Sequence, residues 1–187
     1  MSCPVVVIDV EGVLAVDPDA LPGGQAAVRE LGYQAHEFDG LGPDGSSACG
    51  TVWLKPEHGA WLRELRDRGA ELVWGTSWGR VAVTWIAPRL GLPEFPVIEV
   101  PRRGPAFGWS SKIGPIQRWV GDRPLAWIDD QLGGKEPGWA EERRDDDIPT
   151  LIVQPHPGRG LERAHVEEIL SWLTAARSCG AGGTPAP

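Results

Sequence analysis

The sequence predicts an α/β protein whose central parallel sheet is covered by helices on both faces. Short apolar runs alternate along the chain with segments of helical periodicity, and continuous runs of this kind are typical of strands buried on both faces. Several runs are followed directly by acidic or hydroxyl residues, which indicates a site beyond the carboxyl ends of the strands. The predicted strands occupy residues 4–9, 72–74, 97–100, 125–128 and 150–153.

After the first strand, a segment at about residues 15–54 interrupts this alternation and is rich in Gly, Pro and Asp. Within it, residues 33–38 and 51–54 have the composition of two paired strands. We predict a small flap built around this hairpin, too short to form a separate lid domain. Four residues in or near the flap are candidates to line a neighbouring site: His36, Trp53, Trp78 and Arg80.

Four segments have the signals of amphipathic helices. The first lies between Pro56 and Gly69, which mark its start and its end. The second covers residues 80–90 and is interrupted by Pro88, and the third begins at Lys112. The fourth has the clearest apolar stripe, with spacing i, i+3, i+4 and i+7: Val166, Ile169, Leu170 and Leu173.

The chain of 187 residues is long enough for one domain with its own core. We expect that domain to span residues 1–176, with the flap as an insert. The acidic stretch at 141–147 is expected to be a solvent-exposed loop. Residues 177–187 end in GAGGTPAP, a composition typical of a flexible tail.

Composition excludes several classes of function. The net charge of -8 and the pI near 5.0 argue against a protein held to nucleic acid or to an anionic membrane by electrostatic attraction. No apolar run approaches the ~18 residues that span a bilayer, and no basic region precedes the first apolar run as in a signal peptide. Neither the three cysteines nor the four histidines have metal-ligand spacing, so we expect reduced thiols and histidines that lie at the surface or partly packed. A cytoplasmic protein is expected, and the oligomeric state has no signal in the sequence.

Two distant apolar runs end in pairs of carboxylates. VVVI is followed by Asp9 and Glu11, and LAWI is followed by Asp129 and Asp130. Four carboxylates at one edge of a sheet would repel one another unless a cation joined them, and oxygen ligands of this kind suit Mg²⁺. These residues therefore predict a Mg²⁺ site for phosphoryl chemistry, in which a buried carboxylate attacks phosphorus.

Three further residues suit the binding of a phosphoryl group. Thr76 and Ser77 follow the strand in ELVWGTSWG and can donate hydrogen bonds to phosphate oxygens. Lys112 stands at the start of a predicted helix, where a cation is unfavourable by about 0.3–1 kcal/mol. Its position there is explained if it faces bound anions.

In these motifs the chain resembles the haloacid dehalogenase-like (HAD) hydrolase superfamily, whose members are mostly Mg²⁺-dependent phosphatases. The first family motif, Asp-x-Asp-Gly-x after a strand, corresponds to DVEGV from Asp9. The second corresponds to LVWGT with Thr76, the third to Lys112, and the fourth to WIDD with Asp129 and Asp130. The resemblance covers residues 4 to about 153, apart from the flap. It implies a three-layer Rossmann-like sandwich and a phosphorylated small-molecule substrate.

By this resemblance Asp9 is the nucleophile, and the backbone carbonyl of Glu11 joins Asp9 and the two acids of the fourth motif around Mg²⁺. Thr76 and Lys112 hold the phosphoryl group. One departure concerns the second Asp of the first motif, the general acid and base, which is Glu11 here. The extra methylene moves its carboxyl by about an ångström, and a displacement on that scale can cost about 100-fold in rate.

Two other functions remain open at this point. The run Gly75 to Gly79 matches the G-x-S-x-G nucleophile elbow of serine hydrolases, with Ser77 as nucleophile and His156 downstream. Against this reading, no Gly-rich oxyanion segment is evident, and the pair Asp9 and Glu11 is left unexplained. The second alternative is a protein of the same fold that binds phosphorylated ligands or a partner without catalysis, with Glu11 as the altered position.

Overall fold

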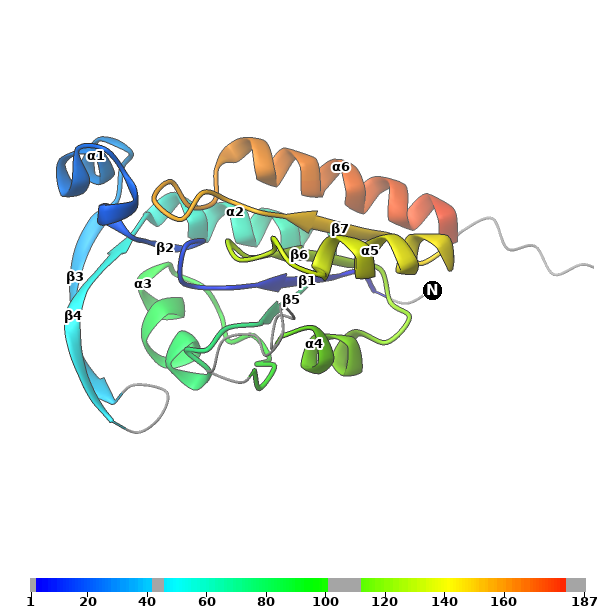
Figure 1. Cartoon of the computed structure of the whole chain (residues 1–187), viewed down its shortest axis with the longest axis horizontal. Coiled ribbons are helices and arrows are strands. Elements are labelled where there is room, and N and C mark those ends of the chain that lie inside the picture. Colours follow the sequence, from blue (N-terminus) through cyan, green and yellow to red (C-terminus); the bar gives the residue numbers. More distant parts are fainter. Residues whose placement is uncertain (1–2, 42–45, 101–111, 181–187) are drawn as a thin grey trace, which may run out of the picture.

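A computed structural model of the chain describes residues 3–41, 46–100 and 112–180. Over these residues the fold is α/β, as the sequence predicts, with a four-stranded parallel sheet in the order β5-β1-β6-β7 (Figure 1). The first strand is therefore internal, with a parallel neighbour on each side. The strands are β1 (Val5–Ile8), β5 (Glu71–Trp74), β6 (Leu125–Ile128) and β7 (Thr150–Val153).

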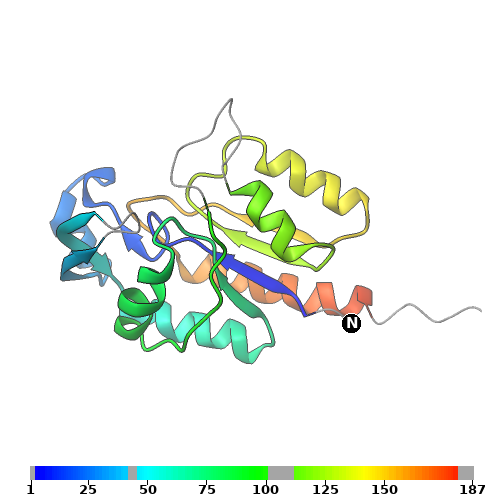
Figure 2. The same cartoon turned by 90° about the horizontal axis from the view of Figure 1, so that it is seen from below.

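Helices cover both faces of this sheet: α2 (Pro56–Asp67) and α6 (Arg163–Gly180) lie on one face, and α4 (Ile113–Val120) and α5 (Glu136–Asp145) on the other (Figures 1 and 2). Successive residues of β1 divide between two cores, because side chains of a strand alternate between its faces. Val6 and Ile8 pack with α2 and α6, whereas Val5 and Val7 pack with α4 and α5. All four are fully buried, which explains the continuous apolar run.

The segment after β1 forms the predicted flap, and Figure 1 shows it beyond the end of the sheet at which β1 ends. Its elements are β2 (Ala15–Val16), the 3₁₀ turn η1 (Pro18–Ala20), α1 (Gly24–Glu30), β3 (Gln34–Leu41) and β4 (Ser47–Leu54). β3 and β4 pair antiparallel, which confirms the predicted hairpin and lengthens it. β2 pairs with β4 and so connects the hairpin to the chain that leaves β1.

The predicted helix at 80–90 is present in a different form, as the π-helix η2 (Ala82–Ile86) followed by the single turn α3 (Ala87–Arg89). Pro88 has no N–H to donate to the carbonyl of Thr84, so the regular α-helical bond cannot form at that step. The proline therefore alters the helix without ending it, since Leu90 N still donates to the carbonyl of Ile86 at 3.2 Å.

An aromatic cluster of Phe38, Trp78 and Trp85 joins the flap to the segment after β5. The ring of Phe38 packs at a steep angle to those of Trp78 and Trp85, with centroids 5.5 and 5.1 Å away. The guanidinium of Arg89 lies 3.7 Å from the centroid of the Trp85 ring. Aromatic pairs of this geometry contribute about 0.5–1.5 kcal/mol each beyond their burial, so the cluster holds the hairpin against the rest of the domain.

His58 departs from the expectation for the histidines, because it is fully buried on α2. Its Nε2 lies 2.9 Å from the carbonyl oxygen of Leu161, and the ring of Tyr33 packs edge-on at 5.5 Å. Tyr33 in turn donates its hydroxyl to the carbonyl of Arg159 at 2.8 Å. Burial lowers the pKa of His58 to about 4, so the ring is neutral at pH 7 and donates from Nε2. These contacts tie the start of the hairpin to α2 and to the segment before α6.

The predicted strand at 97–100 is wrong. Only Val97 forms a bridge, to Trp74, and Ile98 N donates to the carbonyl of Trp74 at 2.8 Å. β5 itself ends at Trp74, so among the described residues no strand pairs with Glu99 and Val100. The apolar run is explained by burial of Ile98 in the core beneath α4.

The predicted loop at 141–147 is also wrong, because most of this stretch belongs to α5. The buried side of α5 carries Trp139, which packs edge-on to Trp127 with ring centroids 6.2 Å apart. It also carries Arg143, which donates to the hydroxyl of Thr150 at 2.9 Å and to two backbone carbonyls. A helix whose buried side includes a charged residue has a weak apolar stripe. The acidic residues between 141 and 147 face solvent, as expected for this stretch.

The last helix is longer than expected. The predicted stripe is buried in α6 at Val166, Ile169 and Leu173, and Leu170 is half-buried. α6 continues to Gly180, so the expected tail from residue 177 begins too early. Ala176 is still buried, and the sequence has no helix-breaking residue before Gly180. Among the described residues, no helix is both long and apolar enough to cross a bilayer.

Candidate functional site

The register of the sheet places Asp9 beside Asp129. Ile8 at the end of β1 pairs with Ile128 at the end of β6, so both strands end at the same level. Asp9 N donates to the carbonyl of Ile128 at 3.0 Å and extends the pairing by one residue. The two carboxylates therefore leave neighbouring strand ends in the same direction, and both residues are buried.

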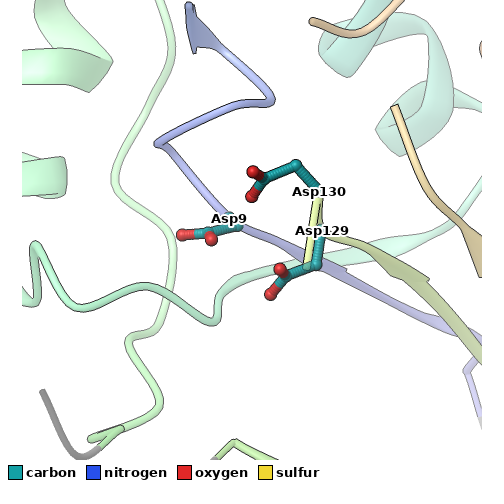
Figure 3. Close-up of side chains that lie close together, drawn as sticks. All are labelled: Asp9, Asp129 and Asp130. Atoms are coloured by element: carbon teal, nitrogen blue, oxygen red, sulfur yellow. The ribbon is translucent and has the colours of Figure 1, made fainter. Parts of the chain in front are cut away.

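Three carboxylates meet at this edge of the sheet. Asp9, Asp129 and Asp130 each offer an oxygen, and these oxygens lie within 4.8 Å of one another. Figure 3 shows the three side chains extending to the same side of the strand ends. The carboxylate of Glu11, which the sequence also placed at this edge, is exposed and is not one of these three. The metal role that the resemblance implies for Glu11 belongs to its backbone carbonyl and stays a prediction. We call Asp9, Asp129 and Asp130 the acid cluster.

Asp130 can join the acid cluster because Gly12 lies directly against it. A Cβ atom at Gly12 would lie 2.3 Å from the carboxyl carbon of Asp130, and the backbone there has φ +67°, a conformation that favours glycine. The Oδ1 atom of Asp130 is buried and has no hydrogen-bond partner among the described residues. An unpartnered buried carboxylate oxygen is costly, and a bound cation would remove that cost.

Lys112 lies between two members of the acid cluster. Its Nζ donates to Oδ2 of Asp9 at 2.5 Å and to Oδ2 of Asp129 at 2.6 Å. The other carboxylate oxygens of these two residues accept backbone N–H groups, from Val10 at 2.7 Å and from Gln131 at 3.0 Å. The Lys112 side chain is 16% exposed, so its pairing takes place largely out of solvent. Lys112, at the start of α4, thus places its ammonium group beside the ends of β1 and β6.

The charges of the site shift the pKa values of its members. Burial raises the pKa of Asp9 to about 6, against the opposing attraction of Lys112 and with a further contribution from Asp129. Burial and the charge of Asp129 also raise the pKa of Asp130 to about 6. For Lys112, burial favours the neutral amine, but the attraction of Asp9 and Asp129 outweighs it and raises the pKa above its ordinary value.

The residues present fit a divalent cation. Three carboxylates and one ammonium leave a net charge of about -2 when ionised, which one divalent ion would balance. The free oxygen of Asp130 supplies a ligand position without breaking a hydrogen bond. Hard oxygen donors of this kind favour Mg²⁺ over softer metals, so Asp9, Asp129 and Asp130 could hold that ion.

The residues predicted to bind phosphate lie at the end of β5. Thr76 is buried, and a hydrogen bond from its side chain lowers the pKa of Asp9 in opposition to burial. Its hydroxyl also accepts the N–H of Trp78 at 3.3 Å. Ser77 is half-buried next to it. Gly75 lets β5 approach β1 closely, since a Cβ there would lie 2.3 Å from a side-chain carbon of Val7. Thr76 and Lys112 are thus both brought to Asp9.

A pocket of about 360 Å³ opens beside the acid cluster, and we call it the flap pocket. It includes Trp53 and Trp78, two of the four residues expected to line a site near the flap. His36 and Arg80 are not among its described lining residues. The lining residues are Glu11, Gly12, Ala15, Val16, Asp17, Thr51, Val52, Trp53, Trp78, Asp130, Gln131 and Pro157. Asp17, Gln131 and Pro157 have no sequence signal for this role, because only the fold brings them to the flap.

The described residues form no serine-hydrolase triad. Ser77 and His156 make no hydrogen bond to each other over this part of the chain, and Nδ1 of His156 accepts the N–H of Gly158 at 3.1 Å. Asp129 is paired with Lys112 and not with a histidine. The geometry that activates a serine nucleophile is therefore not assembled around Ser77.

The site combines a buried carboxylate, two further acids, a lysine and a hydroxyl at the end of a parallel sheet, with an adjoining pocket. Such a set can place a cation and an anionic group next to Asp9. No family model matches the chain, and neither a curated protein nor a solved structure matches it.

Proposed function

We propose that this protein is a Mg²⁺-dependent phosphatase of the HAD-like hydrolase superfamily that hydrolyses a phosphorylated small molecule. The observation that carries the proposal is the convergence of Asp9, Asp129 and Asp130 with Lys112 at one edge of the sheet. Buried acids that share a lysine and leave an oxygen unpartnered fit a cation and a phosphoryl group better than a purely structural role. When bound, Mg²⁺ would neutralise charge on the phosphoryl oxygens and orient the group.

In the first step, a carboxylate oxygen of Asp9 attacks phosphorus, and the bond between phosphorus and the ester oxygen breaks. Lys112 and Thr76 stabilise the phosphoryl oxygens through an ammonium and a hydroxyl that already lie next to Asp9. Glu11, on the wall of the flap pocket, gives its proton to the departing alcohol. The products of this step are the free alcohol and an aspartyl phosphate on Asp9.

In the second step, water attacks the phosphorus of the aspartyl phosphate. Glu11, now a carboxylate, takes the proton of the water, and the bond from phosphorus to the Asp9 oxygen breaks. Inorganic phosphate leaves, and Asp9 and Glu11 return to their starting states. One residue can serve in both steps because Glu11 is exposed on the pocket side, where alcohol and water both arrive.

The proposal is tested with a panel of phosphomonoesters assayed with Mg²⁺ and with EDTA. We expect phosphate release that requires Mg²⁺ and returns when the ion is restored, because the proposed mechanism needs the ion that the three acids are placed to bind. A fluorophosphonate probe serves as the opposing assay. Labelling of Ser77 without Mg²⁺, together with EDTA-resistant hydrolysis, would overturn the proposal and favour the serine-hydrolase alternative.

The variant Glu11→Asp tests whether the longer side chain limits the reaction. We expect kcat to rise by about 10-fold or more, since Asp shortens the side chain by the methylene that displaces the carboxyl. Glu57→Asp, at an exposed carboxylate on α2, is the matched control and should leave kcat unchanged. If Glu11→Asp and the natural protein both bind Mg²⁺ and inorganic phosphate but neither turns over any ester, the non-catalytic alternative holds instead.

A further inference from the structure

The flap pocket is placed to receive the leaving group of the substrate, an inference that rests on the proposed function. Its inner end is formed by Gly12 and Asp130, which belong to the site or contact it. Its outer wall is formed by Thr51 and Trp53 of β4. A group bonded to a phosphoryl group at Asp9 therefore has a space of about 360 Å³ to enter, near the lower end of the range for small-molecule sites.

The charge of this pocket is negative. Three of its described lining residues are acidic: Glu11, Asp17 and Asp130. No described lining residue is Lys or Arg. Asp17 is held in place because its Oδ1 accepts the N–H of Asp19 at 2.9 Å, in the cap of η1. A second anionic group on the substrate would meet these carboxylates with no Lys or Arg among the described residues that line the pocket. A positive or uncharged group would not be repelled by them.

The rest of the lining is largely apolar. Trp78 contributes a half-buried ring that is fixed by Phe38, and Trp53 contributes a side chain that is 3% exposed. Val16, Val52 and Pro157 add aliphatic surface, while Thr51 and Gln131 provide polar groups. A small pocket that combines apolar and polar groups suits a compact organic group better than an extended, highly charged one.

We propose that the substrate is a small phosphomonoester whose leaving alcohol is uncharged or cationic, and that esters carrying a second anionic group are excluded by the flap pocket. The physical reason is the repulsion between that anion and the carboxylate of Asp17, with no Lys or Arg among the described lining residues to offset it. In the proposed mechanism Asp130 is assigned to Mg²⁺ and Glu11 carries the proton for the leaving alcohol, so Asp17 is the carboxylate left to act on the leaving group. The amine of a cationic alcohol gains the opposite interaction with Asp17.

Two matched pairs of esters test this inference. Phosphoethanolamine and phosphoserine differ by one carboxylate, as do glycerol 3-phosphate and 3-phosphoglycerate. We expect kcat/KM to be at least about 10-fold higher for the member without the carboxylate in each pair. Equal values, or a preference for the carboxylate-bearing member, would overturn the inference even if the protein is a phosphatase.

A variant connects the preference to the pocket. Asp17→Asn removes one carboxylate and keeps a side-chain oxygen that can cap η1. We expect the ratio of kcat/KM within each pair to shrink by about threefold or more. Asp19→Asn is the control, because this exposed acid lies two residues away and does not line the pocket. An unchanged ratio in Asp17→Asn would remove the pocket as the cause.

Failure of the proposed function is recognised separately. If the protein with Mg²⁺ cleaves neither the matched esters nor 4-nitrophenyl phosphate, it is not the phosphatase proposed. Isothermal titration with phosphoethanolamine and phosphoserine then decides the pocket inference on binding alone. At least about 10-fold tighter binding of phosphoethanolamine supports the inference, whereas equal affinities or no binding of either compound overturn it.

Discussion

Asp9→Asn is expected to abolish phosphatase turnover while the protein stays folded. Asparagine lacks the anionic oxygen that attacks phosphorus, so kcat should fall by about 10⁴-fold or more. The variant also removes one negative ligand from the acid cluster, which should weaken Mg²⁺ binding. Activity is measured as phosphate release on the best ester of the panel, and Mg²⁺ affinity by titration calorimetry.

The fold of Asp9→Asn should survive because the asparagine oxygen can still accept the N–H of Val10. Loss of a buried carboxylate whose pKa is raised also removes a desolvation cost, which offsets part of the lost pairing with Lys112. Asp67→Asn, at an exposed acid at the end of α2, is the matched control and should keep full activity. Normal turnover by Asp9→Asn would show that the nucleophile is assigned to the wrong residue.

Lys112→Met is expected to cause the largest loss of stability among these variants. Methionine keeps most of the length of the side chain but leaves Asp9 and Asp129 without the cation that lies 2.5 and 2.6 Å from them. Breaking a buried ion pair by removing one partner costs about 3 kcal/mol or more. We expect a loss of this size in the free energy of unfolding at pH 8 without Mg²⁺, measured by urea denaturation.

The stability of the protein and the loss caused by Lys112→Met are both expected to depend on pH. In the folded protein the pKa values of Asp9 and Asp130 are about 6, above the ordinary aspartate value of 3.8, so the folded state binds more protons than the unfolded state between these values. Burial of these ionised carboxylates, with repulsion from Asp129, therefore costs stability above pH 6, and protonation relieves this cost as the pH falls toward 4. Without Lys112 the pKa of Asp9 rises further, because its nearest positive charge is gone, so the variant takes up a proton at a pH where the natural protein is still ionised. The loss caused by Lys112→Met should therefore shrink as the pH falls from 8 toward 6 and change little below that, and saturating Mg²⁺ at pH 8 should recover part of it.

Lys55→Met is the control for charge removal. Lys55 pairs with Glu57 at 2.9 Å, but the Glu57 side chain is 62% exposed, so this pair contributes less than about 1 kcal/mol. Its stability loss should also be insensitive to Mg²⁺. If Lys112→Met is as stable as Lys55→Met at pH 8 without Mg²⁺, Lys112 does not offset the negative charge of the acid cluster.

Much of the site could be predicted from the sequence because its residues follow buried strands. Apolar runs that end in Asp9 or in Asp129 identify both the strand and the residue just beyond it, and parallel strands end at a common edge. The position of Lys112 near anions could be predicted because a cation at the start of a helix is otherwise unfavourable. Glu11 shows the limit of this reasoning, since adjacency in sequence did not bring its carboxylate into the acid cluster.

The mistaken elements have a common cause. Residues 97–100 are apolar because Ile98 is buried, yet the neighbouring strand ends before they can pair. Residues 141–147 are polar, yet a helix forms because Trp139 and Arg143 find partners in other elements. Local composition predicts burial or exposure, but the element that forms also depends on neighbours from distant parts of the chain.

By itself, the sequence determined the layered α/β fold and the convergence of Asp9 and Asp129, because hydrophobic periodicity and strand ends are local properties. Only the tertiary structure decided which residues line the flap pocket. The flap pocket draws its wall from β4, from the segment after β5 and from Pro157, and its negative charge arises when Asp17 is folded toward Asp130. The position of this wall depends on how the flap packs against the segment after β5 through Phe38 and Trp78. That packing cannot be predicted from a pattern along the chain.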